Sequence, residues 1–215
     1  MLPFPWRQGE HMTVIGDTGT GKTTLIARIL TERKYVLSVR TKSDKTPLPG
    51  KHVRTAAAFK RLDIGRDGRV LLDPAYERQA YEIYHAFETV WREDGWTVNI
   101  DELYYLTSQL GAASRVIERQ INRFLTQGRS KGISVVSGMQ RPVSTTRFAM
   151  SQSSHLIAFR VEGRDRKTLQ DAGGDDWAAA VLGLGRYEFA WYYRPERALW
   201  LGTLDPRSGE LLSIS

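Results

Sequence analysis

Residues 16–24 read GDTGTGKTT, and this stretch decides the fold class of the chain. Within it, Gly16, Gly21, Lys22 and Thr23 match the pattern G-x-x-x-x-G-K-[ST] without a departure. A short β-rich run, HMTVIG (11–16), precedes the match, and KTTLIARILTERK (22–34) follows it with apolar residues at helical spacing. A strand, a glycine-rich loop and a helix in this order predict a phosphate-binding loop that holds a nucleoside triphosphate.

The residue types in this loop are those that bind phosphate groups and a magnesium ion. Glycines let successive backbone N–H groups turn toward phosphate oxygens, and the helix that follows adds the positive end of its dipole. We expect Lys22 to neutralise the β and γ phosphates of ATP and the Thr23 hydroxyl to bind Mg²⁺. The predicted nucleotide-binding residues are Gly16, Asp17, Thr18, Gly19, Thr20, Gly21, Lys22, Thr23 and Thr24.

Outward from the loop, β-rich runs alternate with helical patterns. The runs are YVLSVR (35–40), RVLLDP (69–74), WTVNIDE (96–102), GISVVSGMQRP (132–142) and HLIAFRV (155–161). Helical patterns fill 75–93 and a segment from Ser114, a candidate cap, to about Gln127, after an expected loop at 106–114. Two last runs, RYEFAWYYR (186–194) and ALWLGTL (198–204), predict an antiparallel hairpin at one edge. The pattern predicts an α/β fold with a mostly parallel central sheet flanked by helices.

The run VNIDE supplies the carboxylates of the predicted site. Asp101 ends an apolar strand and is expected beside the magnesium ion, while the adjacent Glu102 points toward the attacking water. A kinase transfers phosphate to a substrate hydroxyl and has less need of a carboxylate that activates water. The pair therefore favours an ATPase.

A third element of the site is the end of the run 132–142. Gln140 stands at the tip of a strand that we expect next to the strand carrying Asp101, so its amide can contact both the γ-phosphate and the attacking water.

TKSD (41–44) resembles the guanine-recognition motif of GTPases, but it follows the second strand directly and no D-x-x-G motif precedes it. We therefore reject a GTPase.

Composition limits the remaining possibilities. A chain of 215 residues with 41% hydrophobic residues predicts one domain spanning 1–215. A formal charge of +7 favours an anionic partner such as nucleic acid. The absence of cysteine excludes disulfides, thiolate catalysis and cysteine-based zinc sites. Without about 18 consecutive apolar residues, no membrane span is expected, and we predict a cytoplasmic protein.

Taken together, five motifs resemble the motor domain of the FtsK/HerA superfamily of hexameric DNA-pumping ATPases. They are GDTGTGKTT, VNIDE, GRSKGISVVSGMQRP, SQSSHLIAFRVEGRDRKTLQDAGGDD and LGLGRYEF, in order from about residue 12 to 190. The resemblance implies a RecA-like (ASCE) core, a homo-oligomeric ring and an arginine supplied to the neighbouring subunit's ATP. By position Arg129 matches that arginine, and Arg123 is its competitor. Met139 stands where a threonine usually precedes the sensor glutamine.

The resemblance covers a motor without the additional domains of chromosome translocases. It therefore implies a small viral or phage genome-packaging ATPase that moves double-stranded DNA, acts in the host cytoplasm or on the virion, and has capsid or portal proteins as further partners. A conjugative or plasmid DNA-transfer ATPase is the nearest alternative. A small-molecule kinase and an ATP-gated assembly or secretion adaptor are alternatives of another class.

DNA contacts are expected mainly from lysine and arginine to phosphate groups. Arg115, Arg119 and Arg123 form a basic stripe on the helix that ends near Gln127, opposite its apolar face. Further basic candidates are Lys131, Arg141, Arg147, Arg164, Arg166 and Lys167. Near the N-terminus, Phe4 and Trp6 are candidates to cover the adenine.

Overall fold

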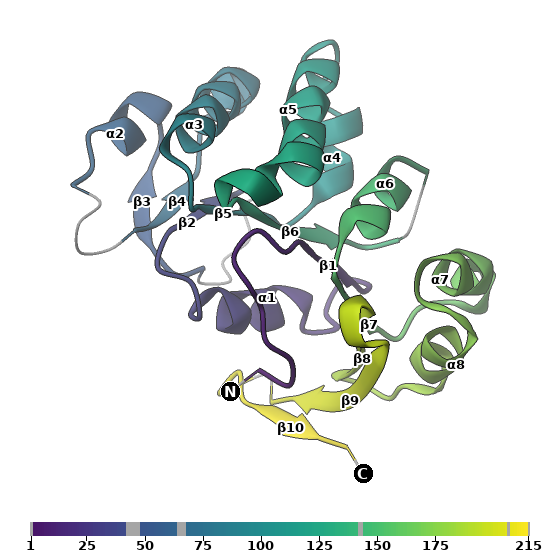
Figure 1. Ribbon diagram of the computed structural model, residues 1–215. Helices are drawn as coiled ribbons and strands as arrows, with labels where there is room; N and C mark the ends of the chain where they lie inside the picture. The colour runs from purple at the N-terminus through teal and green to yellow at the C-terminus, as the bar shows by residue number, and fades with distance from the viewer. Residues whose placement is uncertain (1, 42–47, 64–67, 142–143, 206, 215) are drawn as a thin grey trace.

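The computed structural model describes residues 2–41, 48–63, 68–141, 144–205 and 207–214 (Figure 1). Most of the TKSD motif (Lys42, Ser43 and Asp44) and the proline of MQRP (Pro142) lie outside the described residues.

The described residues form one sheet in the order β10-β9-β8-β7-β1-β6-β5-β2-β4-β3. Its strands are β1 (Met12–Ile15), β2 (Val36–Val39), β3 (Lys51–Val53), β4 (Arg69–Leu72), β5 (Thr97–Ile100), β6 (Ser134–Met139), β7 (His155–Phe159), β8 (Glu188–Tyr193), β9 (Ala198–Leu204) and β10 (Leu211–Ser213). From β7 to β3 every neighbouring pair is parallel, and β8, β9 and β10 are added antiparallel. The predicted fold class is confirmed.

Helices cover both faces of this sheet. They are α1 (Lys22–Leu30), α2 (Ala56–Lys60), α3 (Gln79–Glu93), α4 (Leu103–Ser108), α5 (Ala113–Gln127), α6 (Ser144–Gln152), α7 (Arg166–Gly173) and α8 (Asp175–Gly183). Figure 1 shows α1 on one side of the sheet and α2 to α6 on the other. With both faces covered, β1, β2 and β5 are buried at every position, and their polar residues Thr13, Ser38, Thr97 and Asn99 are buried with the apolar ones.

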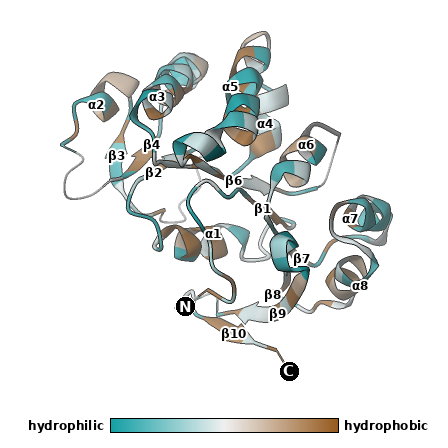
Figure 2. Ribbon diagram, in the orientation of Figure 1, coloured by the Kyte–Doolittle hydropathy of each residue, from teal (hydrophilic) through white to brown (hydrophobic). Residues whose placement is uncertain are grey.

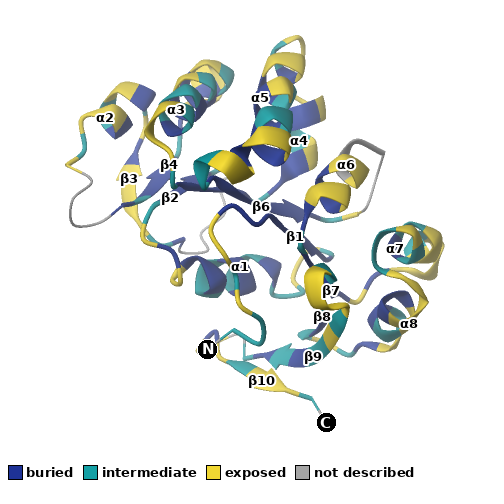
Figure 3. Cartoon of the chain, viewed as in Figure 1, coloured by how far each residue is buried: buried dark blue, intermediate teal, exposed yellow. Residues whose placement is uncertain are grey.

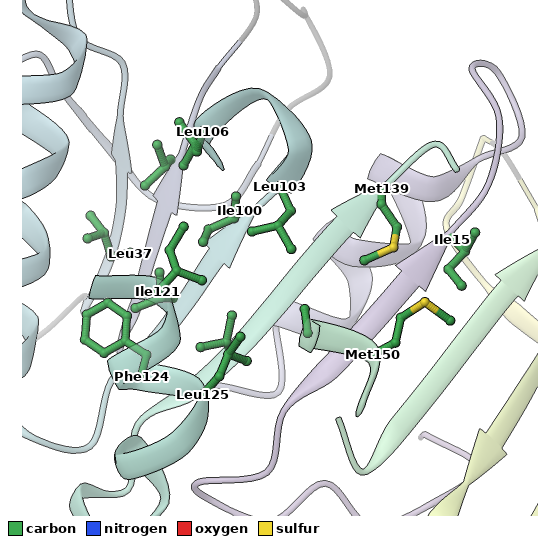
Figure 4. Packing of buried hydrophobic residues seen from close by; sticks show 14 of the residues in the cluster. Ile15, Leu37, Ile100, Leu103, Leu106, Ile121, Phe124, Leu125, Met139 and Met150 are labelled. Atoms are coloured by element: carbon green, nitrogen blue, oxygen red, sulfur yellow. The ribbon is translucent and has the colours of Figure 1, made fainter. Parts of the chain in front are cut away.

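Two clusters of buried side chains hold these layers together. Beneath the sheet, Leu25, Ile26, Ile29 and Leu30 of α1 are fully buried. Above it, the apolar stripe of α5 lies over β2, β5 and β6 (Figure 4). Each large apolar side chain buried in this way stabilises the fold by about 1.5–3 kcal/mol. The opposite faces of α3 and α5 are polar (Figure 2) and exposed (Figure 3).

The segment before β1 lies against the amino ends of the central strands. Trp191 donates its indole N–H to His155 Nδ1 at 3.1 Å, so Nε2 carries the proton and faces Glu10 Oε2 at 3.2 Å. The Tyr193 hydroxyl donates to the other oxygen of Glu10 at 3.3 Å, and Phe4 stacks on the Tyr193 ring. This buried network joins the N-terminal segment to β7 and β8.

The structure corrects three expectations about elements. The expected loop at 106–114 is partly helical, because Leu103 and Leu106 bury one face of α4 and only 109–112 separate α4 from α5. Ser114 does not cap α5, since the helix begins at Ala113, and the Ser114 hydroxyl instead accepts the N–H of Leu110 at 2.9 Å. The C-terminal hairpin forms, but β10 rather than β9 occupies the edge.

Candidate functional site

The phosphate loop connects β1 to α1 at the carboxyl end of the central strand. Gly19 and Gly21 adopt positive φ angles of 81° and 99°, which side chains rarely tolerate, and α1 begins directly afterwards at Lys22. A Cβ on Gly21 would also come within 2.8 Å of a Leu204 methyl group. The positive φ at position 21 therefore favours glycine, and the loop leads directly into the N-terminus of α1, where the helix dipole favours an anion.

Thr23 and Asp101 meet at the edge of this loop, although 78 residues separate them in sequence. The Thr23 hydroxyl donates to the Asp101 carboxylate, with distances of 3.3 and 3.4 Å to its two oxygens. Lys22 is 8% exposed, and its ammonium donates to the Gly16 carbonyl at 3.3 Å. A hydroxyl, a carboxylate and an ammonium thus converge at the helix N-terminus.

The sheet order explains how the remaining predicted residues reach this point. Because β6 lies between β1 and β5, Gln140 directly follows a strand that separates the phosphate loop from Asp101 and Glu102. The Gly16 N–H donates to the Met139 carbonyl at 3.1 Å, which ties the loop to the end of β6. On the other side, a Cβ on Gly138 would lie 2.2 Å from the Asp101 carbonyl oxygen. The end of β6 therefore sits tightly between the two halves of the predicted site.

The residues present suit a magnesium ion. Mg²⁺ prefers oxygen ligands and is held in nucleotide sites by one or two protein oxygens together with phosphates and water. Thr23 and Asp101 offer a hydroxyl and a carboxylate side by side. No group of three or more His, Cys, Asp or Glu side chains placed to hold a metal occurs in the part of the chain that the structure describes.

A cavity of about 670 Å³ opens beside the phosphate loop. Its walls are Asp17, Thr18, Gly19, Thr20, Phe159, Arg160, Val161, Glu162, Gly163, Leu182, Gly185, Arg186 and Tyr187. Phe4 and Trp6 are not among them, because Phe4 stacks on Tyr193 and Trp6 lies under the Arg33 guanidinium at the amino ends of the strands. The expectation that they cover the adenine is wrong. The sequence did not single out Arg186 and Tyr187 as site residues. Their only signal was their position within the motif LGLGRYEF.

The two candidate arginines have different surroundings. Arg123 is engaged within the chain, with Nη2 2.6 Å from Glu88 Oε1 and the guanidinium 4.2 Å from the centre of the Trp91 ring. Arg129 lies in the 3-10 turn Gly128–Lys131 after α5 and is exposed. Since a residue that serves a neighbouring subunit must project from its own, Arg129 is the better placed of the two.

The basic candidates for DNA contact are scattered. Lys131 forms an ion pair with Asp94, Arg141 lies 3.4 Å from Glu162, and Arg147 donates to the Thr168 hydroxyl. Arg115 and Arg119 are exposed on α5 and form the basic stripe expected from the sequence, whereas Arg123 is turned into the ion pair with Glu88. The described geometry does not gather these side chains into one site.

The fold and the phosphate loop are those of P-loop NTPases, and the resemblance expected from the sequence is supported by similarity to a phage DNA packaging ATPase and to related solved structures. The chain is 26% identical over 170 residues to the DNA packaging ATPase P9 of Enterobacteria phage PRD1, covering 75% of this chain and 69% of P9. No protein-family model matches the chain.

Solved structures share the fold. The genome packaging NTPase B204 of Sulfolobus turreted icosahedral virus 2, in complex with AMPPCP, superposes with a TM-score of 0.70 at 15% identity, over 90% of this chain and 97% of B204. The conjugation coupling protein TcpA of pCW3 gives a TM-score of 0.61 at 16% identity, over 89% of this chain and 59% of TcpA. Among the described residues, no helix has the length and apolar character needed to span a membrane.

Proposed function

We propose that this protein is an ATP-hydrolysing double-stranded DNA translocase that packages a viral genome. The observation that carries the proposal is the coincidence of a complete phosphate loop, a Thr23–Asp101 contact and sequence similarity to the packaging ATPase P9. The similarity to TcpA is one of fold alone, so the sequence relationship to P9 favours packaging over conjugative transfer.

In the proposed reaction each site residue has a distinct role. The backbone of the loop and Lys22 hold the phosphates, and Thr23 with Asp101 would hold Mg²⁺, which when bound offsets the negative charge of the phosphates. Glu102, 8% exposed at the start of α4, accepts a proton from the attacking water. Gln140, at the end of the intervening strand, contacts the γ-phosphate and reports its loss.

The protein is further proposed to work as one domain in a ring. One sheet runs through the described part of residues 1–215, which supports a single RecA-like motor domain. Arg129 projects from its own subunit and completes the site of the next one, in a ring that is hexameric by analogy with the superfamily. Capsid or portal proteins are the proposed partners of the ring, and the host cytoplasm or the virion is its proposed location.

The decisive measurement is ATP turnover of the purified protein over a range of protein concentrations, with and without long double-stranded DNA, at low and moderate salt. A shared-site motor shows a rate per subunit that rises with concentration and rises further with DNA. The DNA effect weakens with salt, because phosphate contacts release counterions. A rate per subunit that is constant and untouched by DNA would instead support the adaptor interpretation, and phosphate transfer to a small molecule would support the kinase.

A further inference from the structure

The turn between α8 and β8 carries an unusual backbone beside the phosphate loop. Tyr187 has a φ of 64°, in the left-handed region that aromatic side chains rarely occupy. Such strain persists only where surrounding contacts enforce it, and it clusters at functional sites. Figure 1 shows α8 beside the β7–β8 part of the sheet. The turn residues Gly185, Arg186 and Tyr187 line the cavity beside the phosphate loop.

Three hydrogen bonds hold the turn in place. The Glu188 carboxylate accepts the Gly185 N–H at 2.6 Å, and the Glu188 N–H donates to the Gly185 carbonyl at 3.4 Å. From the neighbouring strand β9, the Leu204 N–H donates to the Tyr187 carbonyl at 3.0 Å. The ring of Tyr187 is therefore presented by a fixed backbone and not by a free loop.

The ring of Tyr187 lies beside the phosphate loop. A Cβ built on Gly21 would be 3.5 Å from Tyr187 Cδ1, so the ring edge faces the last glycine of the phosphate loop. The Arg186 guanidinium lies 4.8 Å from the centre of the same ring. Both side chains line a cavity of about 670 Å³ that also includes loop residues 17–20. Small-molecule sites have volumes of about 300–1,000 Å³, so the cavity has room for a nucleoside.

We propose that Arg186 and Tyr187 form the base site, which binds the purine base of the nucleotide by stacking on its face and not by hydrogen-bonding to its edge. This inference rests on the proposed nucleotide-binding function and adds its base-binding residues. Aromatic rings and guanidinium planes stack on any base, because every base offers a π face. The base site consequently binds adenine and guanine nucleotides with similar affinity.

The test uses the whole chain and three probes with Mg²⁺: AMPPCP, GMPPCP and inorganic tripolyphosphate, which has no base. Tyr187→Asn removes the ring while keeping a residue that tolerates the left-handed backbone, and Tyr187→Phe keeps the ring. Calorimetric titration is expected to show that Tyr187→Asn weakens both nucleotides by about tenfold or more and leaves tripolyphosphate binding unchanged. Tyr187→Phe is expected to bind all three like the wild type.

Other outcomes would overturn the inference. If Tyr187→Asn binds both nucleotides as tightly as the wild type, or loses tripolyphosphate to the same extent, the base does not stack on Tyr187. If the wild-type protein binds none of the probes, the proposed function itself is wrong, and so is the base site that rests on it.

A second variant covers the case in which Tyr187→Asn does not fold. Arg186→Ala truncates an exposed side chain outside the phosphate loop, and it is expected to weaken both nucleotides by about two- to fivefold with tripolyphosphate unaffected. Unchanged nucleotide binding by this variant would contradict a role for Arg186 in the base site.

Discussion

At the residue scale, the site depends on oxygen and nitrogen atoms placed within hydrogen-bond reach of one another. Thr23 and Asp101 illustrate this, since their contact at 3.3 Å requires the end of β5 to face the first turn of α1. Each residue was identified in the sequence by its motif, but the contact between them is a property of the sheet order.

Glu102 gives the sharpest prediction at this scale. Glu102→Gln keeps the size and hydrogen-bonding capacity of the side chain but removes the base, so we expect ATP binding to persist while turnover falls by at least about a hundredfold. Nucleotide titration and steady-state hydrolysis measure the two quantities separately. A Glu102→Gln protein that turns over ATP near the wild-type rate would remove Glu102 from its role, whereas Lys22→Ala is the control that loses binding itself.

At the element scale, the carboxyl end of β6 is the tightest junction in the site. A Cβ at Gly138 would come within 2.2 Å of the Asp101 carbonyl and 2.9 Å of its carbon. Because both are backbone atoms, the strands themselves must move apart to admit a methyl group.

Gly138→Ala is therefore expected to lower the free energy of unfolding by about 1–3 kcal/mol and to slow ATP turnover by displacing Asp101. Gly183→Ala is the matched control, since a Cβ there meets nothing within 4 Å. Denaturant unfolding of both variants checks the expectation. Equal stability of the two variants would show that the β5–β6 junction opens without cost.

At the scale of the whole molecule, the proposed ring places Arg129 of one subunit at the ATP site that the phosphate loop of the next subunit forms. Arg129→Ala lacks only the proposed donated arginine, and Lys22→Ala lacks only its own phosphate site. Each variant alone is expected to be inactive, and a mixture of the two is expected to recover turnover at the interfaces that pair an intact loop with an intact Arg129. If mixing restores nothing while both variants fold, Arg129 does not act across an interface.

Acid stability is a second property of the whole molecule. Burial lowers the pKa of His11 and of His155 to about 4, outweighing the hydrogen bonds that raise these pKa values. Between pH 6.5 and about 4 the unfolded chain binds protons that the folded chain does not, so stability is retained above pH 6.5 and falls as the pH is lowered. Each histidine contributes a slope of up to about 1.4 kcal/mol per pH unit.

Denaturant unfolding across this pH range measures the slope. His155→Gln does not titrate, while its amide can still accept the Trp191 N–H and donate to Glu10, so this variant is expected to have a shallower pH dependence than the wild type. An unchanged slope would assign the acid sensitivity to other groups.

Sequence patterns predicted much of this architecture because the strands are short runs rich in β-branched and other apolar residues that alternate with helical patterns. The errors fell where packing outweighs local composition. Residues 106–108 contain small and polar side chains typical of loops, yet they complete α4 because Leu103 and Leu106 bury against the sheet. Phe4 and Trp6 gave no sequence signal of their place, because aromatic residues stack equally well in a core or on a base.

By itself the sequence determined the phosphate loop, the Asp101–Glu102 pair and the alternation of strands and helices, since each depends on residues close together in the chain. The expected neighbourhood of β5 and β6 is confirmed, but only the tertiary structure decided that β1 lies on the other side of β6, that Arg123 is held by Glu88 while Arg129 is exposed, and that Tyr187 borders the loop. These features join segments up to 166 positions apart, the separation of Gly21 and Tyr187, and local patterns contain no information on such pairings. They arise when strands pair and buried faces close over one another.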